Sequence, residues 1–333
     1  MINPRFSIIM LVYNTPENYL KVAVDSILNQ TNKNYELIII DDGTKREETL
    51  KTIEQYKDNA IIKHQENMGM PASRIEGLKI ASGDYVIFVD SDDYLNPDTL
   101  NIYKNIIESH NSDIVMHDFV KFSGSFDNIL AHSHYFNKGE VDKKEVIKQL
   151  CLLHTNGTCG RAVKRELFEG MEHNIDRRLA VGEDVQQSTH VILNANTFYY
   201  TDEKIYFYRI IQEHREYYGI DKIDDFNFLT PVYNQIFVKH SEYNKYLSVF
   251  KNSAMNSVVY NSFRICLFAE NKEQKRELLN KLSSIEINTI IKSIREKGSF
   301  VSETLYFIFS HKLFLSLNIL SKVYDSIYKM QKL

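Results

Sequence analysis

Three carboxylates stand close together in Asp90-Ser91-Asp92-Asp93, directly after the apolar stretch 85–89. A β-branched and aromatic run of this length predicts a buried parallel strand. Crowded carboxylates repel one another and are costly to hold near a dry core without a cation. Open α/β sheets bind ligands outside the carboxyl ends of their strands, and Mg²⁺ or Mn²⁺ prefers oxygen ligands. The run therefore indicates a site for a metal and a diphosphate, with a solvated acidic turn as the alternative.

Strand and helix patterns alternate through the first hundred residues. The patterns predict strands at 6–13, 35–40, 60–63 and 85–89, and helices at 16–30, 45–57 and 71–81. Such alternation is typical of βαβ units and of a mostly parallel sheet. Further along, the sequence predicts helices at 100–109, 142–153 and 183–194, strands at 113–119 and 197–208, and a loop or hairpin at 120–140. The fold class is therefore α/β, followed from about residue 221 by a helical region.

Composition excludes several classes of protein. The chain of 333 residues carries a net charge of -4, which provides no basic field for nucleic acid. Its three cysteines include no C-x-x-C, so neither a disulfide framework nor a zinc site is indicated. We find no signal peptide and no apolar run of the roughly 20 residues that a membrane span needs. These features predict a cytoplasmic protein without a nucleic-acid partner.

Four segments occur in a set order along the chain. They are Tyr13-Asn14 after the first strand, Asp41-Asp42-Gly43-Thr44 after the second, Asn67-Met68-Gly69 followed by Arg74, and Asp90-Ser91-Asp92. This ordered set resembles the family-2 glycosyltransferases, which are inverting enzymes with the GT-A fold. The resemblance covers residues 5–100 closely and extends more loosely to about Arg209. It departs from the usual pattern at Thr44, where Ser is common, and at Ile75, where Asn often follows the Arg.

The resemblance implies a GT-A catalytic domain over residues 1–215, with a mostly parallel sheet flanked by helices, and a helical region over residues 216–333. It also implies a nucleotide-sugar donor, with UDP as the expected nucleotide, and Mn²⁺ or Mg²⁺ as the cofactor. The acceptor would be a glycan or a lipid-linked glycan in the synthesis of a bacterial surface polysaccharide such as a capsule.

By the same resemblance, several residues would bind the nucleotide sugar. Tyr13 would stack on the base, because every base has a π-face, although a plain surface tyrosine is the alternative. Asp42 would accept a hydrogen bond from uracil or ribose, with Asp41 in a structural role. An Asx turn at Asp42 is compatible with that role. Asn67 and Ser91 complete this part of the predicted donor site.

The metal and diphosphate would be held nearby. Asp92 is assigned to the metal, and Asp90 to the ribose with help to the metal. Arg74 would present a planar fork to a phosphate, or would form a salt bridge with one of the aspartates at a strand end. His214 is the candidate for an additional metal ligand, and an exposed histidine is the alternative. Arg209 and Arg215 are further candidates for holding the diphosphate.

The catalytic base is expected at Glu183-Asp184, at the start of a predicted helix. In the family that the chain resembles, such a pair supplies the general base, usually the Asp, which takes the proton of the acceptor hydroxyl. Without the resemblance, the pair would only complement the helix dipole. Arg161 and Lys164 would meet a phosphate-bearing acceptor, or are solvated charges.

The final segment, 304–333, has apolar residues at helical spacing with lysines between them. Seven basic and three acidic residues lie between positions 292 and 333, which gives +4. Such a helix would attach the protein peripherally to anionic lipid at the inner face of the plasma membrane, or would pack on its own domain. Acceptor recognition and homo-oligomerisation are further roles for the region. The rival to the enzyme as a whole is a catalytically silent, glycosyltransferase-like partner subunit.

Overall fold

The structure is a computed structural model, which describes residues 3–123, 129–131, 135–155, 157–173, 182–210 and 225–254, together with residues 176, 179, 257, 273, 276 and 277. The chain divides into two compact units. The first comprises Met1–Leu150 with His154–Glu213, and the second comprises Cys151–Leu153 with His214–Leu333. Three sequence predictions lie outside the described residues: the metal ligand His214, the diphosphate candidate Arg215 and the helix at 304–333.

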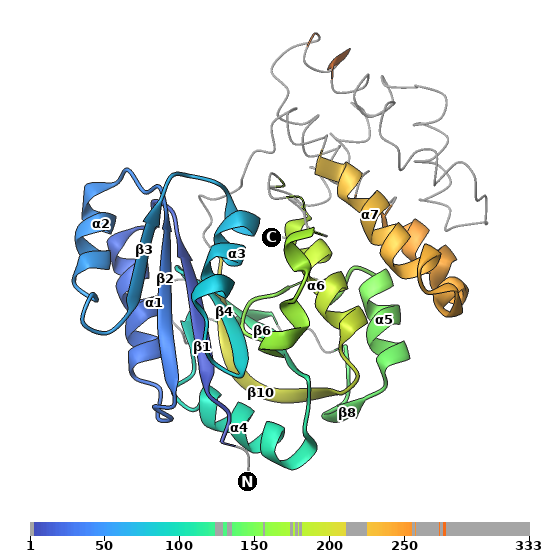
Figure 1. Cartoon of the computed structure of the whole chain (residues 1–333), viewed down its shortest axis with the longest axis horizontal. Coiled ribbons are helices and arrows are strands. Elements are labelled where there is room, and N and C mark those ends of the chain that lie inside the picture. The colour runs from blue at the N-terminus through green and yellow to red at the C-terminus, as the bar shows by residue number, and fades with distance from the viewer. Residues whose placement is uncertain are drawn as a thin grey trace. The chain divides into compact units, whose positions relative to one another are not determined.

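The first unit is built on a parallel sheet. Its first four strands are β1 (Phe6–Val12), β2 (Tyr35–Asp42), β3 (Ile61–Gln65) and β4 (Tyr85–Asp90), in the order β3-β2-β1-β4. Helices α1 (Glu17–Leu28) and α2 (Glu47–Glu54) lie on one side of these strands, and α3 (Met70–Ile80) lies on the other (Figure 1). Because both faces are covered, β1 and β4 are apolar and buried along nearly their whole length.

The register of these strands brings the predicted site residues to one edge. Leu11 of β1 pairs with Asp90 of β4, and Val12 pairs with Asp41 of β2. The carboxyl ends of three neighbouring strands are therefore level, and the loops that follow them meet. This is the edge where open α/β sheets bind ligands.

The sheet continues beyond β4 with two long strands and with several short strands, most of them antiparallel to their neighbours. The further elements are β5 (Tyr94–Leu95), α4 (Thr99–His110), β6 (Ile114–Phe122), β7 (Ile129–Ala131), β8 (Gly139–Val141), β9 (Ala162–Lys164) and β10 (Phe198–Arg209). The long strands β6 and β10 pair in parallel, whereas β9 lies between β4 and β6 and runs antiparallel to both. The predicted loop or hairpin at 120–140 thus contains the end of β6 and two short strands, which have too few residues for a periodic pattern.

Two α-helices and two 3-10 turns complete the described part of the first unit: α5 (Lys143–Cys151), η1 (Arg165–Phe168), η2 (Met171–His173) and α6 (Glu183–Asn194). In the second unit, the described elements are α7 (Leu229–Tyr233), the π-helical turn η4 (Asn234–Val238) and the 3-10 helix η5 (Ser241–Tyr246). Among the helices described in either unit, none combines the length and the apolarity that crossing a bilayer requires.

Candidate active site

Arg74 is the centre of a charged cluster between α3, β4 and α6. Its side chain is only 4% exposed, and its Nη1 lies 3.7 Å from Oε1 of Glu183. Burial opposes the charge, but the acidic groups around Arg74 raise its pKa above the ordinary value; they are Cys159, Glu183, Asp90 and Asp184. Its Nε and Nη1 are buried and make no hydrogen bond in the described part of the chain. The expected ion pair thus forms, but with a helix residue rather than with an aspartate at a strand end.

Glu183 and Asp184 occupy the first turn of α6, after Gly182 in a left-handed conformation with φ 85°. Burial, and then the charge of Asp184, raises the pKa of Glu183 to about 7, while Arg74 acts in the opposite sense. Burial also raises the pKa of Asp184, against the charge of Arg74 and a hydrogen bond of 2.8 Å from the backbone N–H of Val185. Carboxyl groups whose pKa values are raised toward neutral pH are suited to proton transfer.

Asp93 anchors the acidic loop, although the sequence motifs do not single it out. It is fully buried, accepts a hydrogen bond of 2.6 Å from the hydroxyl of Tyr206, and accepts one of 2.8 Å from the backbone N–H of Arg209. Burial raises the pKa of Asp93 well above the ordinary value, and the charges of Asp90 and Asp92 raise it further. Strand β10 therefore holds the loop in place through Asp93. The carboxylates of Asp90 and Asp92 add negative charge close to Asp93.

Arg209 supports the same loop rather than pointing to a free diphosphate site. Its Nε donates a hydrogen bond of 2.7 Å to the backbone oxygen of Asp92. Its guanidinium lies over two aromatic rings, 4.5 Å from the ring centre of Tyr19 and 4.6 Å from that of Phe122. Only long-range strand pairing brings Arg209 and Tyr206 to this loop, so a local sequence pattern could not reveal their partners.

Asp90 and Asp92 are the residues that would hold a divalent metal. Asp90 Oδ1 accepts a hydrogen bond of 3.2 Å from Cys159 Sγ, and the Ser91 hydroxyl lies 2.6 Å from that of Thr15. No group of three or more His, Cys, Asp or Glu side chains forms a ready metal cage among the described residues. A nucleotide site does not require one, because Mg²⁺ is commonly held by one or two carboxylates plus phosphate oxygens. The two carboxylates, in a loop whose charge raises the pKa of Asp93, fit such an ion.

Tyr13 lies at the end of β1 and is exposed. Its side chain has 52% of its surface in contact with solvent. The next residue, Asn14, adopts φ 52°, and its Oδ1 accepts hydrogen bonds from the backbone N–H groups of Lys45 and Arg46 at 2.9 and 3.1 Å. This turn joins the ends of two strands and leaves the ring of Tyr13 accessible for stacking.

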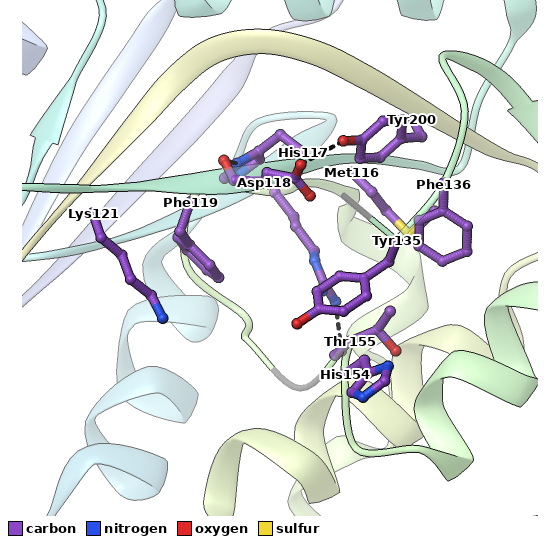
Figure 2. A pocket seen from close by; sticks show the side chains of 11 residues that line it. Met116, His117, Asp118, Phe119, Lys121, Tyr135, Phe136, His154, Thr155 and Tyr200 are labelled. Carbon is purple, nitrogen blue, oxygen red and sulfur yellow. Dashed lines mark hydrogen bonds between the residues drawn. The ribbon is translucent and has the colours of Figure 1, made fainter. Parts of the chain in front are cut away.

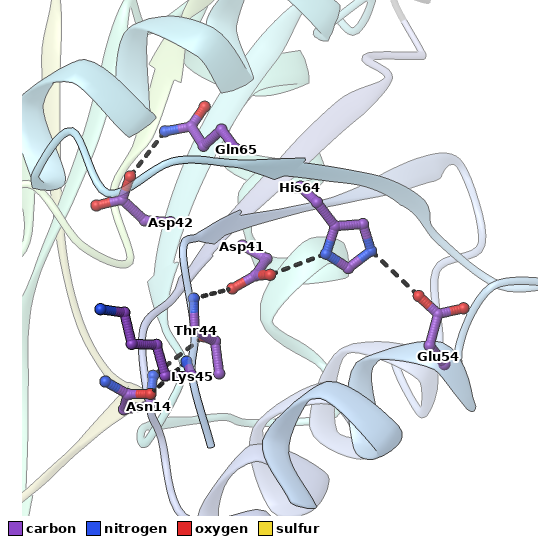
Figure 3. A network of polar contacts seen from close by, with 8 residues as sticks. All are labelled: Asn14, Asp41, Asp42, Thr44, Lys45, Glu54, His64 and Gln65. Atoms are coloured by element: carbon purple, nitrogen blue, oxygen red, sulfur yellow. Dashed lines mark hydrogen bonds and ion pairs between the residues drawn. The ribbon is translucent and has the colours of Figure 1, made fainter. Parts of the chain in front are cut away.

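The predicted uracil ligand, Asp42, is held by the protein itself. Its carboxylate accepts a hydrogen bond from Gln65 Nε2 at 2.8 Å (Figure 3). It also accepts hydrogen bonds from the backbone N–H groups of Met68 and Gly69 at 2.8 and 2.9 Å. A carboxylate has about four acceptor positions, so one position remains for a ligand. Asp42 thus fixes the start of α3 and can still face a nucleoside.

Asp41 and Asn67 complete the loops at this edge. Asp41 accepts hydrogen bonds from the backbone N–H of Thr44 at 3.0 Å and from His64 Nδ1 at 2.8 Å (Figure 3), as its predicted structural role requires. Asn67 is exposed and lies against Gly43, where a Cβ would come within 2.6 Å of the Asn67 backbone nitrogen. Gly43 also has φ +78°, so glycine is required here on both counts.

Arg161 and Lys164, the two basic residues predicted to meet the acceptor, lie in different surroundings. Lys164 forms an ion pair of 2.8 Å with Glu166 and one of 3.8 Å with Asp113. Arg161, by contrast, is buried and lines a cavity. Only Arg161 is therefore placed to meet a ligand inside the protein.

Comparisons with known proteins find relatives of this chain. The model of the family described as "Glycosyl transferase family 2" matches residues 7–171. The glycosyltransferase GlyA of Streptococcus pneumoniae is 31% identical over 63% of this chain, but the match spans only 31% of GlyA. An uncharacterised glycosyltransferase of Methanocaldococcus jannaschii is 30% identical over 63% of this chain and 72% of its own length.

A solved structure of S. aureus TarS, residues 1–349 in complex with UDP-GlcNAc, shares the fold. It matches with a TM-score of 0.70 and 20% identity, covering 97% of this chain and 92% of the TarS chain. This likeness confirms the predicted GT-A architecture.

Proposed function

Because the chain belongs to glycosyl transferase family 2, we propose that it moves a single sugar from a UDP-linked donor to a hydroxyl of a growing glycan, with inversion at the anomeric carbon. The product would be a bacterial surface polysaccharide. The observation that carries the proposal is the placement of Arg74 between the acidic loop after β4 and the carboxyl pair that begins α6. One group of carboxylates is thereby available to the donor and another to the acceptor.

Asp184 acts as the general base. It accepts the proton of the acceptor hydroxyl while that oxygen bonds to the anomeric carbon and the bond from this carbon to the diphosphate oxygen breaks, releasing UDP. Attack from the face opposite the leaving group inverts the carbon. Glu183, paired with Arg74, sets the charge around the base.

The donor lies along the loops at the carboxyl ends of β1, β2 and β4. Tyr13 stacks on the base, Asp42 and Asn67 contact the nucleoside, and Asp90 and Ser91 contact the ribose. Mg²⁺ or Mn²⁺, bound by Asp92 with help from Asp90, supplies the charge that stabilises the leaving diphosphate. The TarS fragment solved with UDP-GlcNAc supports UDP as the nucleotide.

Asp184→Asn tests the assignment of the base. We expect transfer to fall by about 10²- to 10⁴-fold, while affinity for the donor is kept, because the amide preserves the shape of the side chain. Release of the free nucleotide and thermal stabilisation would be followed with a panel of UDP-, GDP- and dTDP-sugars and Mn²⁺. Asp58→Asn, at an exposed position, is the matched control.

Turnover like that of the wild type in the Asp184 variant would contradict the base assignment. A wild-type protein that binds none of the donors, with or without metal, would instead favour a silent partner subunit.

Peripheral attachment through residues 304–333 is tested separately. Deletion of that segment should reduce partition onto anionic vesicles, and unchanged partition would exclude the attachment.

A further inference from the structure

A cavity of about 100 Å³ lies in the first unit, beside β6. Asp118 and Lys121 of β6 line it together with Tyr135, His154, Thr155 and Arg161. Figure 2 shows Tyr135, His154 and Thr155 facing the β6 residues across the cavity. None of the donor and metal ligands proposed above lines it, so it is a separate place for a ligand to bind.

The cavity contains a buried cation without a carboxylate partner. Arg161 is 7% exposed, and its one hydrogen bond runs from Nη1 to the backbone oxygen of Thr155 at 3.0 Å. In the described part of the chain, no Asp or Glu lies within ion-pair distance of Arg161. Burial lowers the pKa of Arg161 to about 10, so the side chain is still charged at neutral pH. Buried charges in proteins are normally paired, so this one calls for an anionic partner.

The rest of the lining is compatible with an anion. Asp118 is the one carboxylate among the lining residues, and it accepts a hydrogen bond of 2.7 Å from the hydroxyl of Tyr200. Burial lowers the pKa of His117 to about 4, so this histidine is neutral at neutral pH. Lys121 adds a second cation at an exposed position. The hydroxyl of Thr155 is buried and has no hydrogen-bond partner among the described residues.

An aromatic surface lies next to these donors. The rings of Tyr135 and His154 are stacked, with centroids 4.7 Å apart and an interplanar angle of 21°. Tyr135 is 39% exposed, so its ring is open to a ligand. Aromatic rings of this kind offer an apolar face and a polar edge, which suits a polyol or sugar attached to a charged group.

We propose that this cavity is an acceptor subsite for a phosphate ester, with Arg161 as its buried ligand and Lys121 at its rim. The proposal rests on the transfer function inferred above. Arg161 presents a planar fork that matches phosphate oxygens. The positive charge of Arg161 also lowers the pKa of Asp184, so the cavity and the proposed base are electrostatically linked.

Direct binding tests the subsite without any turnover. Glycerol 3-phosphate and inorganic phosphate would be titrated calorimetrically into the full chain, with UDP and Mg²⁺ present to fill the donor site. We expect Arg161→Gln to weaken binding about 10- to 100-fold, because charge-assisted hydrogen bonds are lost. Arg161→Lys should recover part of the affinity. Lys121→Gln, at an exposed position where folding is not at risk, should weaken binding about 2- to 5-fold.

Lys164→Gln is the matched control, since this lysine is three residues from Arg161 and pairs with Glu166 outside the cavity. Its phosphate binding should equal that of the wild type. Equal phosphate affinity in all variants would overturn the proposal. Weaker binding of UDP alone in the Arg161 and Lys121 variants would also overturn it, because the cavity would then serve the donor diphosphate.

A kinetic comparison separates this proposal from the proposed function. In transfer assays, the Arg161 and Lys121 variants should raise KM for a phosphate-bearing acceptor far more than KM for an uncharged polyol. If the Arg161 and Lys121 variants lose phosphate binding but the wild-type protein transfers no sugar to any acceptor, the proposed function is refuted and the subsite is kept. Normal transfer with an equal effect on both kinds of acceptor would refute the subsite and keep the function.

Discussion

Two acidic clusters lie at the same edge of the sheet, and they are satisfied in opposite ways. After β2, the carboxylates of Asp41 and Asp42 accept five hydrogen bonds from backbone N–H groups and from the side chains of Gln65 and His64. Figure 3 shows those from Thr44, His64 and Gln65. After β4, the buried Asp93 is anchored by Tyr206 and by the backbone of Arg209, yet its pKa is raised well above the ordinary value.

The difference teaches how a sequence motif divides between architecture and chemistry. Donors from the protein itself stabilise the charge after β2, so that cluster shapes its loops without a ligand. Around the loop after β4, burial raises the pKa values of Asp93, Glu183 and Asp184, and neighbouring carboxylates raise those of Asp93 and Glu183 further. Arg74 opposes the rise at Glu183 and Asp184 only in part. An arriving cation would relieve the repulsion among these carboxylates, which is why we propose the second cluster as the site of the metal and of the reaction.

Removal of the metal or of the Asp92 carboxylate should have the largest effect on sugar transfer. It tests whether the cluster after β4 is the one that carries the chemistry. Chelation, or Asp92→Asn, should lower transfer by about a thousand-fold or more, since a metal contributes several kcal/mol to stabilising the transition state. Folding should be unharmed, because Asp92→Asn removes a charge that raises the pKa of Asp93. UDP release and thermal unfolding would be measured together. If the protein transfers sugar at its full rate after chelation, the proposed role of the metal in transfer is refuted.

Arg74→Met should come next, since it removes the cation from the same cluster. Arg74 lowers the pKa values of Glu183 and Asp184, so both should rise in the variant and the acidic limb of the pH–rate profile should move to higher pH. One pKa unit corresponds to about a tenfold loss of rate on that limb. Arg74→Lys keeps the charge and should shift the limb less. A lower rate with an unmoved pH profile would mean that Arg74 only supports the fold.

Glu183→Gln should alter the pH dependence of stability. The native carboxyl keeps its proton up to a pKa of about 7, whereas the unfolded one ionises near the ordinary value of 4.5. The native state therefore binds more protons in this window, and wild-type stability should fall as pH rises through it, by on the order of 3 kcal/mol. Urea unfolding at pH 5 and pH 8 should show this loss in the wild type and not in the variant. Glu47→Gln, on an exposed side chain, should behave as the wild type does.

Asp42→Asn probes the cluster that the protein satisfies by itself. An amide offers one acceptor oxygen in place of two, so at least one of the donors Gln65, Met68 and Gly69 would lose its partner. We expect the free energy of unfolding to fall by about 1–3 kcal/mol, with no relief of the kind expected for Asp92→Asn. Chemical denaturation would measure both, with Asp58→Asn as the control. A stabilised Asp42 variant would make the two clusters alike and break the comparison.

The sequence predicted the elements of this edge because their signals are local. Strands β1, β2 and β4 each contain an uninterrupted apolar run, at 8–12, 37–40 and 85–89, and each run leads into the motif that marks its loop. Glu183 and Asp184 were predicted at a helix start, and α6 does begin at Glu183. In each case the neighbours along the chain were sufficient.

The partners of these residues could not be predicted, because they come from distant parts of the chain. Tyr206 reaches Asp93 across 113 positions, and Cys159 reaches Asp90 across 69. Strand β9 has three residues, too few for a period, yet it lies between β4 and β6 and brings Arg161 to the cavity. What decides whether an aspartate is architectural or chemical is thus its donors, and long-range packing supplies several of them.

His64→Gln should have the smallest effect and sharpens the first half of the comparison. The hydrogen bond to Asp41 raises the pKa of His64 above 6.5, against some burial and with help from Glu54. A raised histidine pKa stabilises the native state below 6.5, and that contribution is lost as pH rises through the native pKa. His64 is 46% exposed, so solvent screening should keep the effect below about 1 kcal/mol. The difference in unfolding free energy between wild type and variant should therefore be small at pH 6, and should vanish at pH 9 or in 1 M salt. A difference well above 1 kcal/mol that disappears in 1 M salt would mean that charge rather than hydrogen bonding holds the β2 cluster, and the contrast with the β4 cluster would fail.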